Sequence, residues 1–411
     1  MTIAPTDAVR APAAASTEDP RRWNMLALLS CTQLAPMSLW FVGSAIAPRL
    51  AERWGLDTGH VGWLTTAVQL GFVSGTAVAA LLNLADLLPS RGYLAVSALL
   101  AAAANAAFGV ASGFGPALAL RFLTGLFLAG VYPPAMKMVA TWFRSGRGLA
   151  IGVVVGSLTI GKATPWLIHA LPHLSPRSLV WIASAAATAT ALITALAYRD
   201  GPFPFPRRPF TLGLAGTVLA HRETRLAIAG YLGHMWELYA MWTWLPAFLA
   251  AGAAAWAARG GASPSPAALD VLAFGAIAMG GLGSVWGGLA AGRIGYARVV
   301  TLAMAVSGAC SLLIGFAFGA SPWLLIGLAW VWGFFVVADS AQFSAMVTEV
   351  APAHAVGTAL TLQTSLGFLL TTATIQLVPV VVQAAGWRWA FAILAIGPAL
   401  GIAAIARLGR R

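Results

Sequence analysis

The sequence predicts an all-α polytopic membrane protein with twelve transmembrane helices in two six-helix halves. Of its 411 residues, 59% are hydrophobic and only 9% are charged, whereas a soluble domain carries about 25% charged residues. The apolar residues fall into twelve runs, each close to the roughly 20 residues that cross a bilayer core of about 30 Å. A polar segment between the sixth and seventh runs separates the two halves.

The chain begins with a polar segment, residues 1–22, that contains no apolar core. It consists mainly of Ala, Pro, Ser and Thr with scattered charges. Such a composition buries too little apolar surface to fold, and it lacks the apolar stretch of a signal peptide. We therefore expect residues 1–22 to form a disordered cytoplasmic tail.

Six apolar runs follow the tail and predict an N-terminal six-helix bundle over residues 23–198. These runs lie at about 24–47, 61–83, 92–112, 117–142, 148–170 and 177–198. Residues 199–225 are rich in Pro and Arg, and we expect them to form a cytoplasmic linker. A second six-helix bundle is predicted over residues 226–411. Its runs lie at about 226–251, 267–291, 297–318, 322–348, 356–384 and 388–406.

The distribution of Lys and Arg predicts the orientation, because cytoplasmic loops carry an excess of these residues. With the N-terminus inside, the cytoplasmic segments hold 16 of the 24 Lys and Arg residues, and the outer segments hold 5. We expect a multi-pass protein of the plasma membrane, of the bacterial inner-membrane type, with both termini in the cytoplasm. The same bias accounts for the net charge of +12, so nucleic acid is not an expected partner.

Two loops at corresponding positions of the halves carry a repeated pattern. The loop over residues 288–298 reads GLAAGRIGYAR, and the loop over residues 83–91 reads NLADLLPSR. Both resemble the loop signature of the major facilitator superfamily, although Asn83 stands where the signature opens with glycine. The resemblance implies gating loops, whose residues are Asp86, Arg91, Arg293 and Arg298.

The fourth run carries a second resemblance to the same superfamily. It contains Arg121-Phe-Leu-Thr-Gly125, which is similar to a signature whose arginine is linked to proton movement. The superfamily implies two six-helix bundles, a solute site between them near the membrane midplane, and alternating access. The glycine-rich fifth run also resembles nitrate and cyanate porters, but the second and eighth runs lack the buried arginines with which those porters bind nitrate.

Three cations lie inside predicted spans, where a charge costs roughly 2.5–3.5 kcal/mol and therefore faces a cavity or a protein interior. Arg121 is expected to pair with a partner in one transport state, and the alternative is an arginine that reaches the outer surface. Lys137 follows a helix break at residues 132–134, and it either lines a cavity or reaches the cytoplasmic surface. Lys162 lies too deep to reach that surface, so we expect it to bind an anionic group or a carboxylate.

Buried acids in the second half are the expected proton carriers. His234 and Glu237 lie three residues apart in the seventh run, so they share one face of a helix. Burial disfavours a charged carboxylate and a nearby cation favours it, so such a pair can load and release a proton. Asp339 in the tenth run is the second buried acid. A structural pairing between helices is the alternative for each, and a metal site is not expected because the ligands are too few.

Amide and aromatic side chains inside the spans are further candidates for contacts with the solute. Gln69 and Gln363 are mid-span amides that either bind solute or join helices with about 1 kcal/mol. Trp236 belongs to a group of aromatic residues that either wall an organic solute or form belts at the membrane interface. The group comprises Trp40, Trp236, Trp242, Trp244 and Tyr239.

Together these features predict a secondary active, proton-coupled transporter of a small polar or anionic solute. A proton antiporter that exports organic compounds is the alternative, although the fifth run lacks the glycine and proline pattern of such antiporters. A polytopic membrane enzyme would need a dense polar motif, and the sequence contains no phosphate loop, paired histidines or acid cluster. We therefore expect no enzymatic activity, no cofactor, and a monomer whose partners are the solute, the proton and the lipid bilayer.

Overall fold

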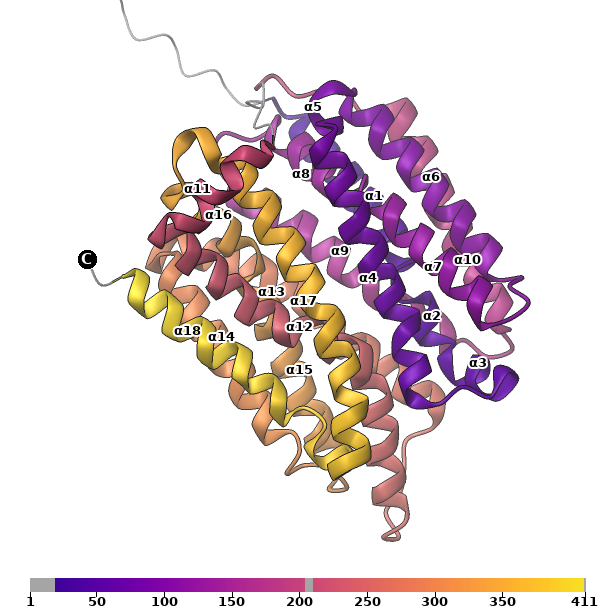
Figure 1. Cartoon of the computed structure of the whole chain (residues 1–411). Coiled ribbons are helices and arrows are strands. Elements are labelled where there is room, and N and C mark those ends of the chain that lie inside the picture. The colour runs from indigo at the N-terminus through magenta and orange to yellow at the C-terminus, as the bar shows by residue number, and fades with distance from the viewer. Residues whose placement is uncertain (1–18, 204–209, 410–411) are drawn as a thin grey trace, which may run out of the picture.

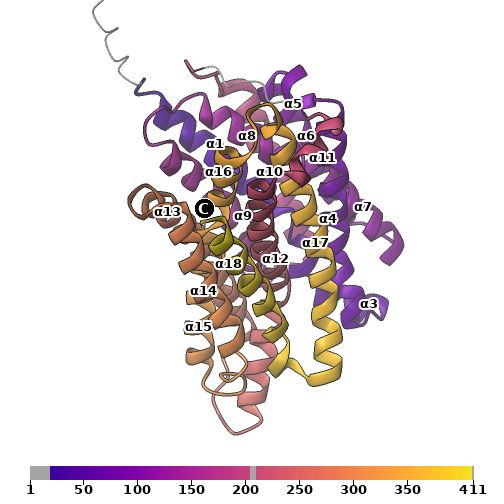
Figure 2. The ribbon, with the colours of Figure 1, turned by 60° about the vertical axis from the view of Figure 1, so that its left-hand side comes forward.

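The computed structural model describes residues 19–203 and 210–409, and within these ranges it contains helices and no strands. The helices form an elongated bundle, with those of the first half on one side and those of the second half on the other (Figure 1). The turned view shows the same division (Figure 2). Helices α5 (Leu84–Leu87) and α11 (Ala215–Ala220) lie at one end of the bundle, called the linker end below. Helix α3 (Ala47–Trp54) lies at the opposite end.

Ten helices of the first half lie within the described residues. Their bounds are α1 (Arg22–Ser38), α2 (Val42–Ala45), α3 (Ala47–Trp54), α4 (Thr58–Leu81), α5 (Leu84–Leu87), α6 (Ser90–Phe108), α7 (Phe114–Leu128), α8 (Tyr132–Ala140), α9 (Arg147–His169) and α10 (Pro176–Ala197).

The described part of the second half contains eight α-helices and four short 3-10 helices. Their bounds are η1 (Leu212–Leu214), α11 (Ala215–Ala220), α12 (Arg222–Ala257), α13 (Pro266–Ile294), α14 (Tyr296–Leu313), α15 (Pro322–Ala338), α16 (Ser340–Val350), η2 (Ala353–Ala355), α17 (Val356–Ala385), η3 (Trp387–Trp389), η4 (Ala392–Ala395) and α18 (Ile396–Leu408).

Eleven helical segments of the described chain are long and apolar enough to cross a membrane. They coincide with eleven of the twelve predicted runs. The remaining run, 24–47, is split, because α1 ends at Ser38 after 17 residues and α2 begins only at Val42. Pro36 lies in the last turn of α1 and removes one N–H from the helical hydrogen bonds there. A break also occurs next to the one predicted at residues 132–134, since α7 ends at Leu128 and α8 begins at Tyr132.

Two helix pairs join the halves, since α9 packs against α13 and α4 packs against α17. Glycines bring the first pair close at the linker end, where a Cβ added to Gly288 would lie 2.8 Å from the carbonyl oxygen of Gly148. In the half of the span nearer to α3, Gln376 Nε2 of α17 donates to Thr66 Oγ1 of α4 at 2.9 Å. The halves therefore contact each other through α9 and α13 on one side of the bundle and through α4 and α17 on the other.

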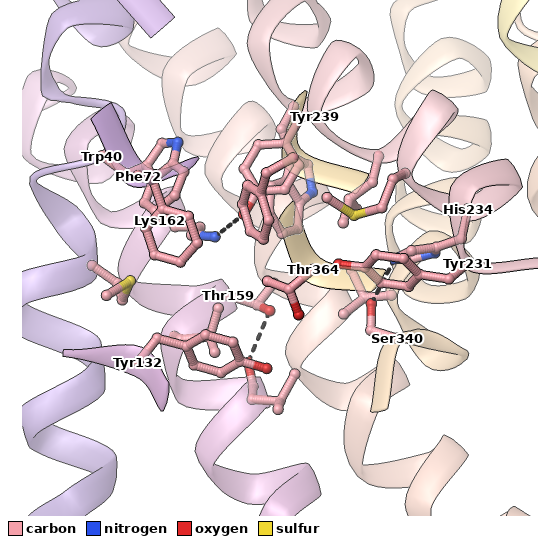
Figure 3. A pocket seen from close by; sticks show the side chains of 18 of the residues that line it. Trp40, Phe72, Tyr132, Thr159, Lys162, Tyr231, His234, Tyr239, Ser340 and Thr364 are labelled. Carbon is pink, nitrogen blue, oxygen red and sulfur yellow. Dashed lines mark hydrogen bonds between the residues drawn. The ribbon is translucent and has the colours of Figure 1, made fainter. Parts of the chain in front are cut away.

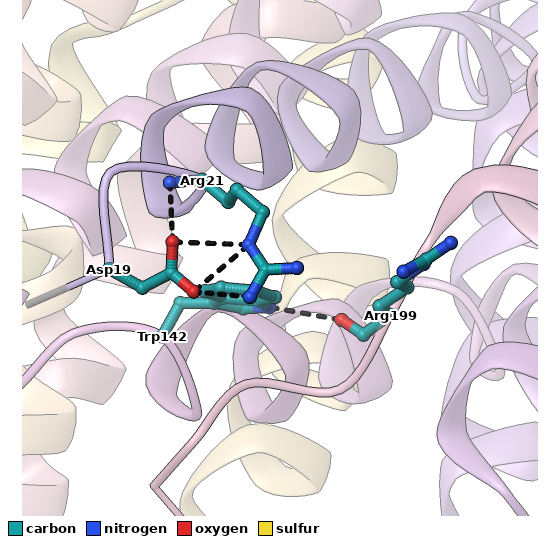
Figure 4. A network of polar contacts seen from close by, with 4 residues as sticks. All are labelled: Asp19, Arg21, Trp142 and Arg199. Atoms are coloured by element: carbon teal, nitrogen blue, oxygen red, sulfur yellow. Dashed lines mark hydrogen bonds and ion pairs between the residues drawn. The ribbon is translucent and has the colours of Figure 1, made fainter.

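Polar contacts join Asp19 to Arg21 before α1, and another joins the linker to the first half (Figure 4). The Asp19 carboxylate accepts hydrogen bonds from the backbone and guanidinium of Arg21, and these bonds lower the pKa of Asp19. Trp142 Nε1 donates to the carbonyl oxygen of Arg199 at 3.1 Å. Of the expected tail, residues 19–22 are described, and α1 begins at Arg22; residues 1–18 lie outside the described residues.

The end of the linker contacts both halves. Phe210 N donates to Asn83 Oδ1 at 3.1 Å, and Thr211 N donates to Thr358 Oγ1 at the start of α17 at 3.0 Å. Asn83 has a backbone φ of +50°, a left-handed conformation that favours glycine and that asparagine tolerates. This conformation explains the glycine of the loop signature at this position, and the asparagine adds a side chain that holds the linker.

The glycine of the second signature, Gly125, lies where α7 crosses α4. A Cβ on Gly125 would lie 2.0 Å from the carbonyl oxygen of Val68, and a Cβ on Gly71 would lie 1.9 Å from that of Phe122. Real Cβ atoms do not approach oxygen this closely, so only glycine permits the contact between these two helices.

Replacing Gly125 with alanine is expected to destabilise the protein by about 1–3 kcal/mol or more, because an overpacked core must shift its backbone. The measurement is the thermal midpoint of the purified protein in detergent. Gly115→Ala in the same helix is the matched control, since a Cβ there meets nothing within 4 Å. Equal midpoints for the two variants would contradict the packing role of Gly125.

Candidate functional site

A cavity of about 80 Å³ lies between the halves. Its walls come from α1, α4, α8 and α9 of the first half and from α12, α15, α16 and α17 of the second. Figure 3 shows Lys162 and Trp40 on one side of the cavity and His234 and Ser340 on the other, with Tyr239 between them. Both halves thus contribute polar groups to one cavity.

Lys162 lies in a cage of three aromatic rings, called the lysine cage below. Its Nζ lies 4.3 Å from the ring centroid of Trp40, 4.6 Å from that of Tyr239 and 5.2 Å from that of Trp242. The Nζ also donates a hydrogen bond to Tyr239 Oη. Cation–π contacts of this kind stabilise a desolvated ammonium, so the cage holds Lys162 where a bare cation would be costly.

The glycine before Lys162 explains why α9 carries this lysine so close to α1. The neighbouring Gly161 lets α9 pack closely on α1, because a Cβ on Gly161 would lie 2.2 Å from the carbonyl oxygen of Leu34. Lys162 is 3% exposed, and no carboxylate of the described chain pairs with it. The cavity therefore contains a buried lysine amine with aromatic neighbours and no anionic partner among the described residues.

His234 lies on the opposite wall and contacts Asp339, which is placed at the junction of α15 and α16. The distance from His234 Nδ1 to Asp339 Oδ1 is 2.9 Å, and both side chains are buried. Asp339 Oδ1 accepts no well-directed hydrogen bond, so the contact is best described as a close electrostatic pair. His234 Nε2 lies 2.9 Å from Ser340 Oγ. His234 and Ser340 line the cavity, whereas Asp339 lies behind the imidazole.

Glu237 has different hydrogen-bond partners from His234, and its expected part in proton coupling stays a prediction. Ser307 Oγ donates to Glu237 Oε2 at 2.8 Å, and Trp332 Nε1 donates to Oε1 at 2.6 Å. These partners come from α14 and α15, and Glu237 does not line the cavity. A spacing of three residues turns a helix by about 300°, so the two side chains lie about 60° apart, enough to separate the cavity wall from the helix interface behind it.

Arg121 is fully buried and does not line the cavity. Its Nη1 donates to the carbonyl oxygen of Leu39 at 2.8 Å and to Asn105 Oδ1 at 3.1 Å, and its Nη2 donates to the carbonyl oxygen of Trp40. The alternative of an arginine that reaches the membrane surface is therefore wrong. No acidic residue of the described chain pairs with the guanidinium.

The remaining expected solute contacts lie outside the cavity wall. Gln69 is buried and forms no side-chain hydrogen bond, while Gln363 Nε2 donates to the cavity residue Ser344 at 3.5 Å. Trp236 donates to the carbonyl oxygen of Ile393 at 3.1 Å on the far side of α12. Lys137 is half-buried in α8 and is also absent from the cavity wall.

The expected gating residues lie at the linker end. Arg91 Nη1 donates to the carbonyl oxygen of Tyr198 at 3.4 Å, and Arg293 and Arg298 are exposed. The side chain of Asp86 lies outside the described residues.

Sequence reasoning missed the hydroxyl groups of the cavity, namely those of Tyr132, Tyr231, Thr159 and Thr364. The two tyrosines carried a signal, since the chain has only 6 tyrosines and a phenol inside a span needs a polar partner. The described residues contain no cluster of three His, Cys, Asp or Glu side chains suited to a metal ion.

The chain is similar to known transporters. The family model of the Major Facilitator Superfamily matches residues 28–290. A crystal structure of a mutant nucleoside transporter NupG superimposes with a TM-score of 0.71 at 12% identity, covering 95% of this chain and 100% of that one. A bacterial homologue of the human lysosomal transporter Spinster, inward-facing and occupied, gives 0.70 at 14%, covering 96% and 98%. At these identities the likeness shows the fold alone.

A shorter stretch is similar to a protein of named substrate. Over 97 residues, or 24% of this chain, it is 32% identical to the 4-hydroxybenzoate transporter PcaK of Pseudomonas putida, and this stretch spans 21% of that protein. With the family match over more than half of the chain, the helical fold and the cavity between the halves, the chain belongs to the Major Facilitator Superfamily and is a multi-pass membrane transporter of a solute.

Proposed function

We propose that the protein is a secondary active transporter that couples the movement of a small organic anion to protons. The observation that carries the proposal is the lysine cage, in which Lys162 lies buried without an anionic partner. An unbalanced charge at membrane depth is costly, and an anion in the cavity would balance it. The aromatic rings around Lys162 favour an anion with an apolar or aromatic body.

The similarity to a transporter named for 4-hydroxybenzoate supports the same class of solute, because that compound is an aromatic carboxylate. We infer that its carboxylate, or that of a related acid, would accept a hydrogen bond from Lys162 Nζ. The ring would lie against Trp40, Tyr239 and Phe368, whose side chains line the same cavity.

Proton coupling is assigned to the pair of His234 and Asp339. With His234 protonated the pair is neutral overall, and the charge of Lys162 is the one that an anion balances. Loss of the proton leaves the Asp339 carboxylate unbalanced inside the span, which is costly. We infer that the loaded carrier holds one proton on this pair and one anion on Lys162, so that the moving load is neutral and the halves can rock around it.

The alternative is a drug and proton antiporter that exports organic compounds. The aromatic wall of the cavity supports this alternative, since cationic drugs also bind aromatic rings. Lys162 opposes it, because a fixed positive charge in the binding site repels an organic cation. We infer that the protein is a monomer without enzymatic activity. We also infer that both termini lie in the cytoplasm and that the membrane is an inner membrane. The Lys and Arg bias of the loops supports this orientation.

The test is counterflow in proteoliposomes that contain the purified protein. Radiolabelled 4-hydroxybenzoate, benzoate, acetate, nitrate and the cation tetraphenylphosphonium are each measured with and without a pH gradient. We expect saturable counterflow of the aromatic anions, and uphill accumulation when the side that supplies the anion is acidic. Transport of the cation driven by the opposite gradient would favour the antiporter, and anion flux that ignores the gradient would indicate uniport.

A further inference from the structure

The break between α1 and α2 leaves backbone carbonyl groups without helical partners. α1 ends at Ser38 and α2 begins at Val42, and no backbone N–H of the described chain donates to the carbonyl oxygens of Leu39 and Trp40. A carbonyl inside a membrane protein must find a donor, because no water is available in hydrocarbon. At this break the donors belong to one side chain, Arg121, which binds both oxygens.

The guanidinium is itself held in place by neighbouring helices. Arg121 Nη1 donates to Asn105 Oδ1 of α6 at 3.1 Å. Asn105 Nδ2 in turn donates to two acceptors of α10, Ser184 Oγ at 2.9 Å and the carbonyl oxygen of Val180 at 3.3 Å, and together these bonds fix the orientation of the amide. On the other side, a Cβ on Gly43 of α2 would lie 3.2 Å from Arg121 Nε, so α2 packs directly on the guanidinium.

The residue whose carbonyl Arg121 binds is the residue that covers Lys162. The indole of Trp40 lies 4.3 Å from Lys162 Nζ, and its ring centroid lies 5.0 Å from that of Phe72 and 5.6 Å from that of Tyr239. The direction of the Cα–Cβ bond follows the orientation of the adjoining peptide groups. Holding the carbonyl of Trp40 therefore constrains the point from which its indole extends over the ammonium, and the rings of Phe72 and Tyr239 pack against it there.

We propose that Arg121 is a positioning residue, which holds the break between α1 and α2 so that Trp40 completes the lysine cage and the cavity binds its anion tightly. The proposal rests on the proposed function for the solute, and it assigns Arg121 to solute affinity where the signature resemblance implies proton movement. Arg121 acts through the Trp40 carbonyl and touches neither the cavity nor an acid of the described chain.

The first test reads the position of Trp40 without any ligand. Protein labelled with 5-fluorotryptophan gives ¹⁹F resonances, and Trp40→Phe and Trp332→Phe identify the signals of those two residues. Arg121→Lys keeps the charge but loses the planar fork that binds two carbonyls, and Asn105→Leu removes the support of the guanidinium. We expect both variants to shift the Trp40 signal and to leave that of Trp332, in the second half, unchanged. An unmoved Trp40 signal in both variants would overturn the proposal.

The second test measures transport of radiolabelled 4-hydroxybenzoate in proteoliposomes. Loss of an oriented hydrogen bond in Asn105→Leu is expected to raise KM about three- to tenfold, while the ratio of pH-driven accumulation to counterflow stays as in the unmodified protein. Ser184→Ala is the matched control, because it removes one partner of Asn105 Nδ2 and leaves the bonds of Asn105 to the carbonyl oxygen of Val180 and to Arg121. An unchanged KM with lost accumulation would assign Arg121 and its partner to proton movement.

The two tests separate this proposal from the proposed function. Absence of any anion transport by the unmodified protein would refute the solute assignment, while the ¹⁹F shifts would still report whether Arg121 positions Trp40. Normal anion transport with an unmoved Trp40 signal would refute the positioning role alone.

Discussion

Replacing Lys162 with methionine is expected to weaken the uptake of small organic anions strongly, through a higher KM, and at the same time to stabilise the unliganded protein. A charged hydrogen bond contributes about 1.5–3 kcal/mol, and each 1.4 kcal/mol is about tenfold in affinity. The loss therefore corresponds to a KM that rises by roughly 10- to 150-fold. Methionine has a similar length, fills irregular space and contacts aromatic rings favourably, so the cage remains packed.

The expected gain in stability follows from the same contacts. Lys162 is buried among Trp40, Tyr239 and Trp242 with no carboxylate beside it, and an apolar side chain in such a place removes the cost of desolvating a charge. We expect the thermal midpoint to rise by about 2 °C or more. A transported anion should raise the midpoint of the unmodified protein, since a ligand of the folded state stabilises it, and should not affect the variant.

Lys137→Met is the matched control for this prediction. Lys137 is a half-buried lysine of the same half that lies outside the cavity wall, so its removal is expected to leave the KM for the anion within about twofold, as for most changes remote from a site. An unchanged KM in Lys162→Met, or equal effects of the two substitutions, would show that Lys162 is structural and that the anion binds elsewhere.

The membrane fold was predictable from the sequence because its signals are additive along the chain. Each span contributes its own apolar run, and a slip of two or three residues at an end does not change the count. The break at residues 132–134 was predictable as well, since two adjacent prolines start a helix and rarely continue one. The split of the first run was not predicted, because Pro36 lies inside an otherwise apolar stretch and many membrane helices tolerate a single proline.

The candidate site was only partly predictable, because a periodic pattern gives the angle between side chains and not what each one meets. The spacing of His234 and Glu237 is right for one helix face, yet one side chain meets Asp339 and the other meets Ser307 and Trp332. Lys162 was identified by its depth alone, because it is an ionisable residue far inside an otherwise apolar run. Its aromatic cage depends on contacts between residues far apart in sequence, which no local pattern contains.

Replacing Asp339 with asparagine is expected to abolish pH-driven accumulation of the anion and to leave counterflow within about twofold, because exchange of anion for anion needs no net proton transfer. Asparagine keeps the size of the side chain and its place beside His234 Nδ1, but it removes the carboxylate with which the pair is proposed to carry a proton. The measurement is the accumulation ratio of radiolabelled 4-hydroxybenzoate in proteoliposomes with an imposed pH gradient, together with counterflow at zero gradient.

Glu237→Gln is the comparison that decides which buried acid takes part in coupling. The Glu237 carboxylate accepts hydrogen bonds from Ser307 and Trp332 on the side of α12 away from the cavity, and glutamine keeps one carbonyl acceptor of the same shape. We expect this variant to retain accumulation, because the glutamine carbonyl can accept from Trp332 Nε1 and its NH2 group can donate to Ser307 Oγ, a hydroxyl that also accepts hydrogen bonds. If Glu237→Gln loses accumulation while Asp339→Asn retains it, Glu237 carries the proton and the pair of His234 and Asp339 only joins α12 to the junction of α15 and α16.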